Sequence, residues 1–131
     1  MRSKKILESL ATEAQIQKAI LDWGKMKDIH IERANVIGTP IIKRDGTKAF
    51  RKAPNKGMSD LIMSYVVDGK PICVWVEVKK SGGKLRESQK DFRNRVEHFG
   101  GEYHIVKSIT DMENLISFLQ KKYGTVDPSP R

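Results

Sequence analysis

Apolar residues recur every three or four positions in three parts of the chain, and this spacing predicts three helices. Capping-box pairs mark the start of the first helix at Thr12 and of the last at Thr110, and the middle helix begins near Glu87. Gly24 is predicted to weaken or end the first helix, and Gly100 and Gly124 are predicted to end the other two. The apolar faces consist of Ile16, Ala19, Ile20 and Trp23, then Phe92, Val96 and Phe99, and finally Met112, Leu115, Ile116 and Leu119.

Four shorter segments predict strands at residues 29–37, 61–67, 71–79 and 103–106. Asp68 and Gly69 are typical of a hairpin turn, so the second and third strands are expected to be antiparallel. The third strand is almost continuously apolar and is predicted to be central and buried on both faces. A helix separates it from the fourth strand, which requires a crossover and a parallel pair. The order α-β-β-β-α-β-α therefore predicts an α/β fold, a small mixed sheet of about four strands with helices on both faces.

Length and composition favour one globular domain. The chain has 131 residues, the usual size of a single domain, which we assign to residues 1–125 with a disordered tail at 126–131. No apolar run approaches the roughly 18 residues of a membrane span, and the basic start shows no signal peptide. The single cysteine, Cys73, excludes an internal disulfide and a cysteine-built zinc site, and we expect it in the core. A cytoplasmic protein without membrane association is expected.

The charge of the chain favours a polyanionic partner. Its net charge is +9, and residues 1–56 hold 13 basic and 6 acidic residues against 12 and 10 in residues 57–131. A basic insertion at residues 43–57, predicted to be an exposed loop or irregular hairpin, contains six cations and only one acid, Asp45. The six are Lys43, Arg44, Lys48, Arg51, Lys52 and Lys56. A solvated loop would have the same composition, but nucleic acid is favoured over an acidic protein or a membrane surface.

One carboxylate interrupts the most apolar strand. Glu77 lies among valines, and burying an unpaired carboxylate costs several kcal/mol or forces it neutral. Lys79 is two residues further on and therefore points to the same face of the strand. An ordinary ion pair at a strand end that leaves the core is one interpretation, and a functional site is the other.

A second carboxylate is predicted to lie beside Glu77. Asp60 comes 8 residues before Asp68, and Glu77 comes 8 residues after Gly69. A hairpin about that turn places the two carboxylates opposite each other or nearly so. Two converging carboxylates can hold a hard divalent cation through oxygen, and a nearby lysine can stabilise phosphate charge.

Two further polar residues are predicted to face the same region. Gln89 and Glu13 each lie on the apolar face of a helix, close to where that helix begins. A position at a helix start that still reaches water would explain each of them separately. Together, four inward polar groups near strand ends indicate a site for phosphodiester hydrolysis.

These residues fall into a wider pattern of Gly57-x-Ser-Asp60, Glu77-Val-Lys79 and Gly82-Gly-Lys-Leu-x-x-x-Gln89-x-x-Phe92. The pattern resembles the PD-(D/E)XK nuclease superfamily and, more narrowly, its VRR-NUC (virus-type replication-repair nuclease) family. Glu13 matches the glutamate of that family's early helix, and Arg33-Ala-Asn35-Val-Ile-Gly38 matches its Arg-x-Asn-x-x-Gly stretch. The resemblance covers about residues 12–120 and implies a restriction-endonuclease-like core.

The resemblance also implies a role for each residue. Ligands of Mg²⁺ or Mn²⁺ would be Asp60, Glu77, the backbone carbonyl of Val78, and Glu13 directly or through water. Lys79 would be the catalytic lysine, and Gln89 would position the water, the lysine or the substrate phosphate. We expect DNA contacts from cations in the basic insertion and from residues beside the site: Arg33, Asn35, Lys43, Arg44, Lys48, Arg51, Lys52, Lys56 and Lys84.

The sequence thus predicts a Mg²⁺- or Mn²⁺-dependent endodeoxyribonuclease. Small stand-alone family members of phage or bacterial origin resemble Holliday-junction resolvases and tend to dimerise, which implies cleavage of branched DNA. One compact site cuts one strand, so paired cuts need the two sites of a homodimer. Two alternatives stay open: a nicking or homing-type nuclease or repair-complex subunit, and a basic DNA-binding module without catalysis.

Overall fold

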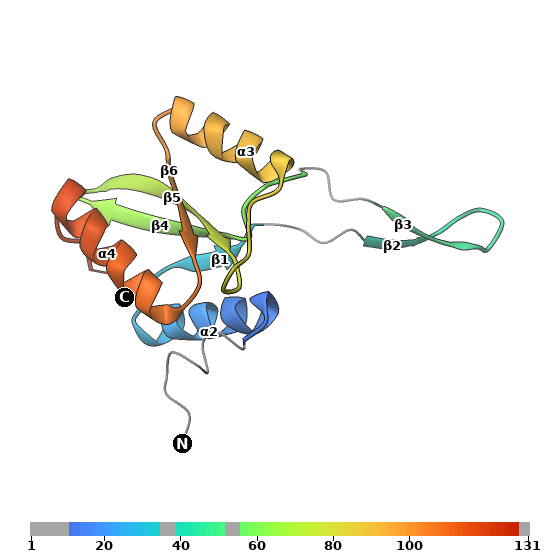
Figure 1. The fold of residues 1–131 in the computed structure, drawn as a ribbon, viewed down its shortest axis with the longest axis horizontal. Coiled ribbons are helices and arrows are strands. Elements are labelled where there is room, and N and C mark those ends of the chain that lie inside the picture. The colour runs from blue at the N-terminus through green and yellow to red at the C-terminus, as the bar shows by residue number, and fades with distance from the viewer. Residues whose placement is uncertain (1–10, 35–38, 52–55, 129–131) are drawn as a thin grey trace, which may run out of the picture.

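The computed structural model describes residues 11–34, 39–51 and 56–128 (Figure 1). Helices flank one four-stranded sheet, and a two-stranded hairpin stands apart from it. The elements are α2 (Glu13–Met26), β1 (Ile31–Arg33), β2 (Thr39–Ile42), β3 (Lys48–Arg51), β4 (Leu61–Val67), β5 (Lys70–Val78), α3 (Glu87–His98), β6 (Glu102–Val106) and α4 (Ile109–Tyr123). The predicted α/β class is confirmed.

The main sheet is mixed, as predicted. Its strand order is β1-β4-β5-β6; β4 is antiparallel to β1 and β5, and β6 is parallel to β5. Asp68 and Gly69 connect β4 to β5 with φ angles of 52° and 74°, the backbone that a two-residue hairpin turn requires. Because this turn sets the register, each residue of β4 lies opposite a defined residue of β5.

The main core lies between the sheet and the helices α2 and α4 (Figure 1). Alternate residues of the two central strands point into it and are at most 1% exposed: Leu61, Met63, Tyr65, Val74, Val76 and Val78. The helices add Ile16, Ile20, Trp23, Met112, Leu115 and Leu119. The predicted capping box starts α2, where the Gln15 amide donates to Thr12 Oγ1 over 3.1 Å and the Thr12 amide donates to Gln15 Oε1 over 3.0 Å.

The helix α3 covers the opposite face of the sheet. The ring of Phe92 packs edge-on against Trp75 of β5 with ring centroids 5.1 Å apart, and its centroid lies 6.2 Å from that of Tyr103 on β6. Glu77 lies two residues after Trp75 and shares this face. The side of the sheet that carries Glu77 is therefore enclosed by α3.

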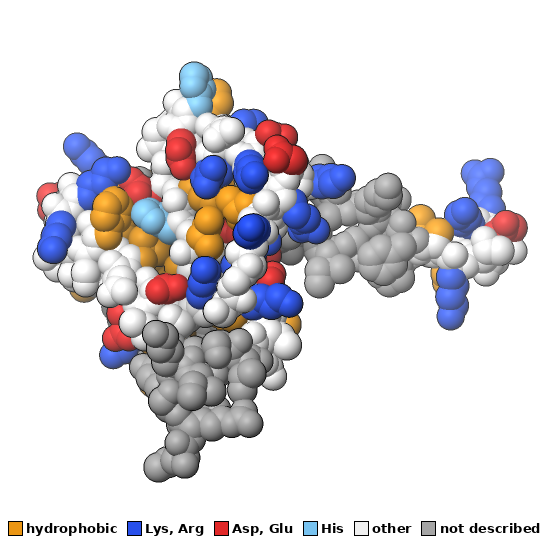
Figure 2. Space-filling model, viewed as in Figure 1, with side chains coloured by type: hydrophobic (Ala, Val, Ile, Leu, Met, Phe, Trp, Pro, Cys, Tyr) orange, Lys and Arg blue, Asp and Glu red, His pale blue; other side chains and the backbone are white. Residues whose placement is uncertain are grey.

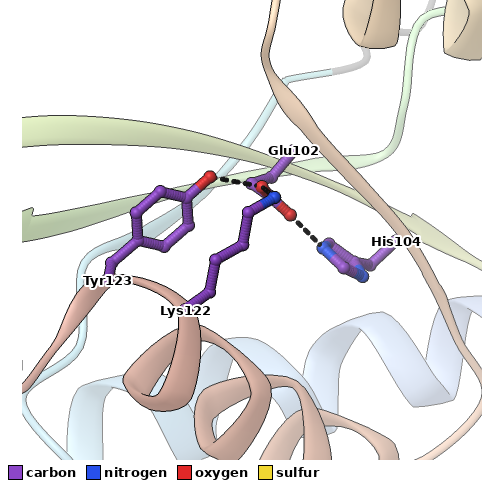
Figure 3. A network of polar contacts seen from close by, with 4 residues as sticks. All are labelled: Glu102, His104, Lys122 and Tyr123. Atoms are coloured by element: carbon purple, nitrogen blue, oxygen red, sulfur yellow. Dashed lines mark hydrogen bonds and ion pairs between the residues drawn. The ribbon is translucent and has the colours of Figure 1, made fainter.

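A buried polar network ties β6 to α4 (Figure 3). Lys122 Nζ lies 2.6 Å from Glu102 Oε2, the Tyr123 hydroxyl donates to the same oxygen, and His104 Nε2 lies 2.9 Å from Glu102 Oε1. Burial raises the pKa of the Glu102 carboxyl, but the hydrogen bonds from Lys122, Tyr123 and His104 outweigh it and lower that pKa to about 2. Glu102 is therefore a buried charge with satisfied partners.

Of the two alternatives predicted for the basic insertion, an exposed loop or an irregular hairpin, the structure shows a hairpin, which is regular and begins earlier than predicted. Its strands β2 and β3 pair in antiparallel register from Thr39 with Arg51 to Ile42 with Lys48. Figure 1 shows it projecting away from the main sheet. A local turn closes its tip, because the Lys43 amide donates to the carbonyl of Thr47 and the Gly46 amide to the carbonyl of Lys43, both over 2.9 Å.

The structure decides one open prediction about the helices and shows that two are wrong. Of the two alternatives for Gly24, it does not end α2, which continues to Met26, because the buried packing of that turn outweighs the low helix propensity of glycine. The cap of α4 is Ser108, not Thr110, since Ser108 Oγ accepts from the Asp111 amide over 3.2 Å. Phe99 follows the end of α3 and is 84% exposed, so it does not belong to the buried face.

The strands and the C-terminal segment also differ from the predictions. β1 is shorter than the predicted 29–37, of which residues 35–37 lie outside the described residues. β5 is buried only from Val74 onward, and Cys73 near its turn is exposed instead of in the core. Residue 127 is not part of a free tail, because its carboxylate accepts from the Asp68 and Gly69 amides over 3.0 and 2.8 Å.

In the part of the chain that the structure describes, no helix has the length and apolar character needed to cross a membrane.

Candidate active site

Asp60 and Glu77 lie opposite each other where β4 begins and β5 ends. Leu61 pairs with Val76, so the next step outward along the same register places Asp60 across from Glu77. Asp60 Oδ2 also accepts a hydrogen bond from the Val78 amide over 2.9 Å, which fixes its carboxylate against β5. The spatial pairing expected from counting outward from the turn is therefore present.

Glu77 is almost completely enclosed. It is 1% exposed, and its Oε1 accepts a hydrogen bond from Gln89 Nε2 over 3.0 Å. Its Oε2 is buried and has no hydrogen-bond partner among the described residues. One oxygen of the carboxylate is thus held by α3 and the other is left for a group that the protein chain does not supply.

The surroundings of Glu77 disfavour its ionised form. Burial raises the pKa of this carboxyl from 4.5 to about 8, and the negative charge of Asp60 adds to the rise. The charge of Lys79 opposes the rise, and Glu13 adds a further increase. A carboxylate whose proton affinity is raised by a neighbouring carboxylate is typical of a site that binds a positive charge.

Gln89 connects α3 to the carboxylate pair. It is 4% exposed, and its Oε1 accepts from the Arg86 amide over 2.8 Å while its Nε2 donates to Glu77. The oxygen of the Gln89 side-chain amide therefore caps the start of α3, and its nitrogen orients Glu77. Gly57 lets the segment before Asp60 approach this turn, since a Cβ there would lie 2.2 Å from the Ser88 carbonyl oxygen.

Lys79 and Glu13 complete the surroundings of the pair. Lys79 follows directly on β5, is 7% exposed, and donates its amide to the Val106 carbonyl over 3.0 Å. Glu13 begins α2 and is half-buried, and its charge reaches Glu77. The structure thus brings the half-buried Asp60 together with the buried Glu77, Lys79 and Gln89, and Glu13 is near enough to influence the electrostatics of Glu77.

Most of the described cations expected to contact DNA are exposed. Lys43, Arg44 and Lys48 lie at the tip of the hairpin, and Lys56 and Lys84 lie on segments next to the site. Arg33 is exposed too, but it pairs with Leu61 and so shares the sheet face opposite that of Asp60 and Glu77. Asn35 and Lys52 lie outside the described residues, as does the side chain of Arg51.

Comparison with family models gives a match to the VRR-NUC domain over residues 3–109. The chain belongs to the VRR-NUC family. As a VRR-NUC protein it is a hydrolase of the nuclease type, with DNA as the substrate class. Comparisons with curated proteins and with solved structures found no significant match.

VRR-NUC nucleases generally depend on divalent metal ions, so the donor set can be tested for fit. Among residues 11–34, 39–51 and 56–128, no cluster of three or more His, Cys, Asp and Glu side chains is arranged to hold a metal. The set here is two facing carboxylates, one of which has a buried oxygen without a partner. Oxygen donors of this kind fit a hard cation such as Mg²⁺ or Mn²⁺, with the remaining positions taken by backbone carbonyl or water.

One buried residue beside this VRR-NUC site was not foreseen. The Tyr103 hydroxyl is buried and has no hydrogen-bond partner among the described residues. Burial raises the pKa of Tyr103, and the negative charge of Glu77 raises it further. In the sequence, Tyr103 looks like any tyrosine of a core strand. Only the pairing of β6 with β5, which places Tyr103 opposite Trp75 and on the same face as Glu77, shows that it lies beside the site.

Proposed function

We propose that this VRR-NUC protein is a metal-dependent DNA endonuclease whose site is built on Asp60, Glu77 and Lys79. The observation that carries the proposal is the unpartnered Oε2 of Glu77, buried beside a second carboxylate. A buried carboxylate oxygen without a partner lowers stability in the absence of a cation, so it is expected at a site that binds one. A strand end with only a structural role would not need a second carboxylate beside Glu77.

Each residue has a distinct part in the proposed reaction. Asp60 and Glu77 would hold the cation through oxygen, with the Val78 carbonyl as the predicted third ligand and Glu13 taking part directly or through water. When bound, a divalent cation would supply charge neutralisation at the phosphate and make a water molecule easier to deprotonate. Lys79 stabilises the negative charge that develops on the phosphate. Gln89 is a positioning residue, because its amide holds Glu77 in place.

The proposed substrate is branched or duplex DNA. Cations gather on the projecting hairpin and around the site (Figure 2), and such a surface binds the phosphate backbone. Paired cuts in a four-way junction need two sites related by two-fold symmetry, so we propose that the active form is a homodimer, as in Holliday-junction resolution. Nicking of one strand, or work inside a repair complex, would need only one.

A cleavage experiment tests the proposal. End-labelled four-way junction and matched linear duplex are incubated with the protein in Mn²⁺ or in chelator. The same is done with Glu77→Gln and with the control Glu113→Gln on the exposed surface of α4. We expect symmetric cuts in the junction that vanish in chelator and with Glu77→Gln, and that persist with Glu113→Gln. Junction that is retarded in a gel but uncut under every condition would favour the DNA-binding module without catalysis.

A further inference from the structure

The hairpin of β2 and β3 is rooted at Asp60. The chain leaves the main sheet at Ala34, whose amide donates to the Asp60 carbonyl over 2.9 Å. It returns through Lys56 and Gly57, where the backbone lies against the first turn of α3. Both ends of the insertion therefore meet within a few residues of one proposed metal ligand. Whatever the hairpin binds is thus linked through both ends of the insertion to the part of the chain that carries the proposed cutting site.

The tip of the hairpin carries more positive than negative charge. Lys43, Arg44 and Lys48 are exposed there. The only described acid of the hairpin, Asp45, accepts from the Thr47 amide over 2.9 Å and from Thr47 Oγ1 over 2.6 Å, so it caps the turn and pairs with none of the cations. Figure 2 shows these basic side chains standing out on the projecting arm. The surface is complementary to a chain of phosphates.

The same tip carries an apolar side chain in an unusual place. Ile42 is 77% exposed, although it lies within a paired strand and opposite Lys48. A two-stranded ribbon without a core beneath it is only marginally stable alone, so the hairpin is expected to gain contacts on binding. The major groove of B-DNA is wide enough to admit a two-stranded ribbon, with cations on the phosphates and an apolar group at base edges.

The length of the hairpin gives the scale of the contact. From Thr39 to Lys43, where the turn begins, the paired ribbon advances by about 13 Å, at roughly 3.3 Å per residue. Duplex DNA rises about 3.4 Å per base pair, so the paired part of the hairpin reaches along about four base pairs. Single-stranded DNA offers no groove for a ribbon of this width.

We propose that the hairpin is a β-ribbon that enters a groove of a duplex arm next to the cutting site. Its tip cations and Ile42 thereby set a minimum of about four base pairs of duplex on that side of the cut. The proposal that the hairpin binds duplex depends only on the structure of the hairpin, and the position of the cut rests on the proposed function.

Binding in chelator tests the duplex contact without any cleavage. The triple variant Lys43→Ala, Arg44→Ala, Lys48→Ala is compared with a charge-matched control, Lys25→Ala, Lys70→Ala, Lys121→Ala, whose cations are exposed on other elements. If the three tip cations contact phosphates, the slope of log affinity against log salt becomes less steep by about 2.7 in the hairpin variant. Between 50 and 200 mM salt the wild type then loses about 40-fold more affinity for duplex than the hairpin variant does.

Arm length and strand form separate the possible outcomes. We expect the wild type, but not the hairpin variant, to lose affinity when one arm of the substrate is shortened below about four base pairs. Ile42→Ser is expected to weaken duplex binding without changing the salt slope. The proposal is overturned if the hairpin and control variants behave alike, or if single-stranded DNA of equal length depends on the tip cations as strongly as duplex does. Duplex binding that depends on the tip cations but is not followed by cleavage would support the proposal for the hairpin and refute only the proposed nuclease activity.

Discussion

Two buried glutamates in the same sheet are expected to respond in opposite ways to one isosteric substitution. Glu77 faces Asp60 and has an unpartnered oxygen, whereas Glu102 has hydrogen bonds to Lys122, Tyr123 and His104. The contrast allows the electrostatic cost of the proposed site to be measured against an internal control.

The magnitude follows from the two carboxyl pKa values. The pKa of Glu77 rises from 4.5 to about 8 on folding, and each tenfold change in proton affinity corresponds to about 1.4 kcal/mol. At pH 7 the unfolded chain gains about 3 kcal/mol from ionising this carboxyl, and the metal-free native state gains almost nothing. The pKa of Glu102 falls from 4.5 to about 2, so its charge stabilises the native state by about 3 kcal/mol at pH 7.

Urea unfolding of the wild type, Glu77→Gln and Glu102→Gln in chelator measures both effects. At pH 7 we expect Glu77→Gln to be more stable by about 3 kcal/mol, because glutamine keeps an acceptor for Gln89 and carries no charge. Its advantage arises as pH increases from 4.5 to 8 and disappears below 4.5. Glu102→Gln is expected to be less stable by about 3 kcal/mol above pH 4.5, and that loss shrinks as pH falls toward 2.

Saturating Mn²⁺ should raise the free energy of unfolding of the wild type and leave that of Glu77→Gln nearly unchanged. The stability advantage of Glu77→Gln therefore becomes smaller or reverses. The reasoning is refuted if Glu77→Gln is less stable than the wild type in chelator at pH 7. That result would mean that the buried carboxylate is already compensated by the protein.

Two substitutions with matched controls test the packing around the site. Tyr103→Phe removes an unpartnered hydroxyl and should leave the free energy of unfolding unchanged or raise it. Tyr65→Phe removes a 2.8 Å hydrogen bond to the Gly124 carbonyl and should lower the free energy of unfolding in urea by about 1 kcal/mol. Equal losses in both would show that Tyr103 has a partner. Gly57→Ala should cost about 3 kcal/mol or more, because its φ is +86° and the new Cβ would lie 2.2 Å from the Ser88 oxygen. Gly69→Ala, with a φ of +74° and open space around it, should cost only about 1–2 kcal/mol by thermal unfolding; similar costs would contradict the tight contact at Ser88.

The meeting of Asp60 and Glu77 could be predicted because a local signal determines it. Asp68 and Gly69 specify a two-residue turn, and that turn sets the register of both strands up to their far ends. The inward position of Gln89 likewise follows from helical spacing. Its bond to Glu77 could not be read from the sequence, since it depends on how α3 lies on the sheet.

Features that depend on distant partners were missed. Glu102 is held by residues 20 and 21 positions further on, and nothing local marks it as a buried charge. Phe99 and Cys73 were expected to be buried because apolar residues usually are, but each lies where an element leaves the core. A hairpin was one of two structures predicted for the basic insertion, but its regular pairing was not, because the composition of this segment indicates charge and exposure and does not indicate which backbone groups pair.

The central claim is that Asp60 and Glu77 together bind a divalent cation, and calorimetric titration of Mn²⁺ tests it most directly. The wild type is compared with Asp60→Asn, which keeps an acceptor for the Val78 amide, and with Asp22→Asn, whose carboxylate pairs with Lys18 on the surface of α2. We predict one site per chain in the wild type and in Asp22→Asn, and at least tenfold weaker binding in Asp60→Asn. Binding that is absent in the wild type, or equally tight in all three proteins, would contradict the account.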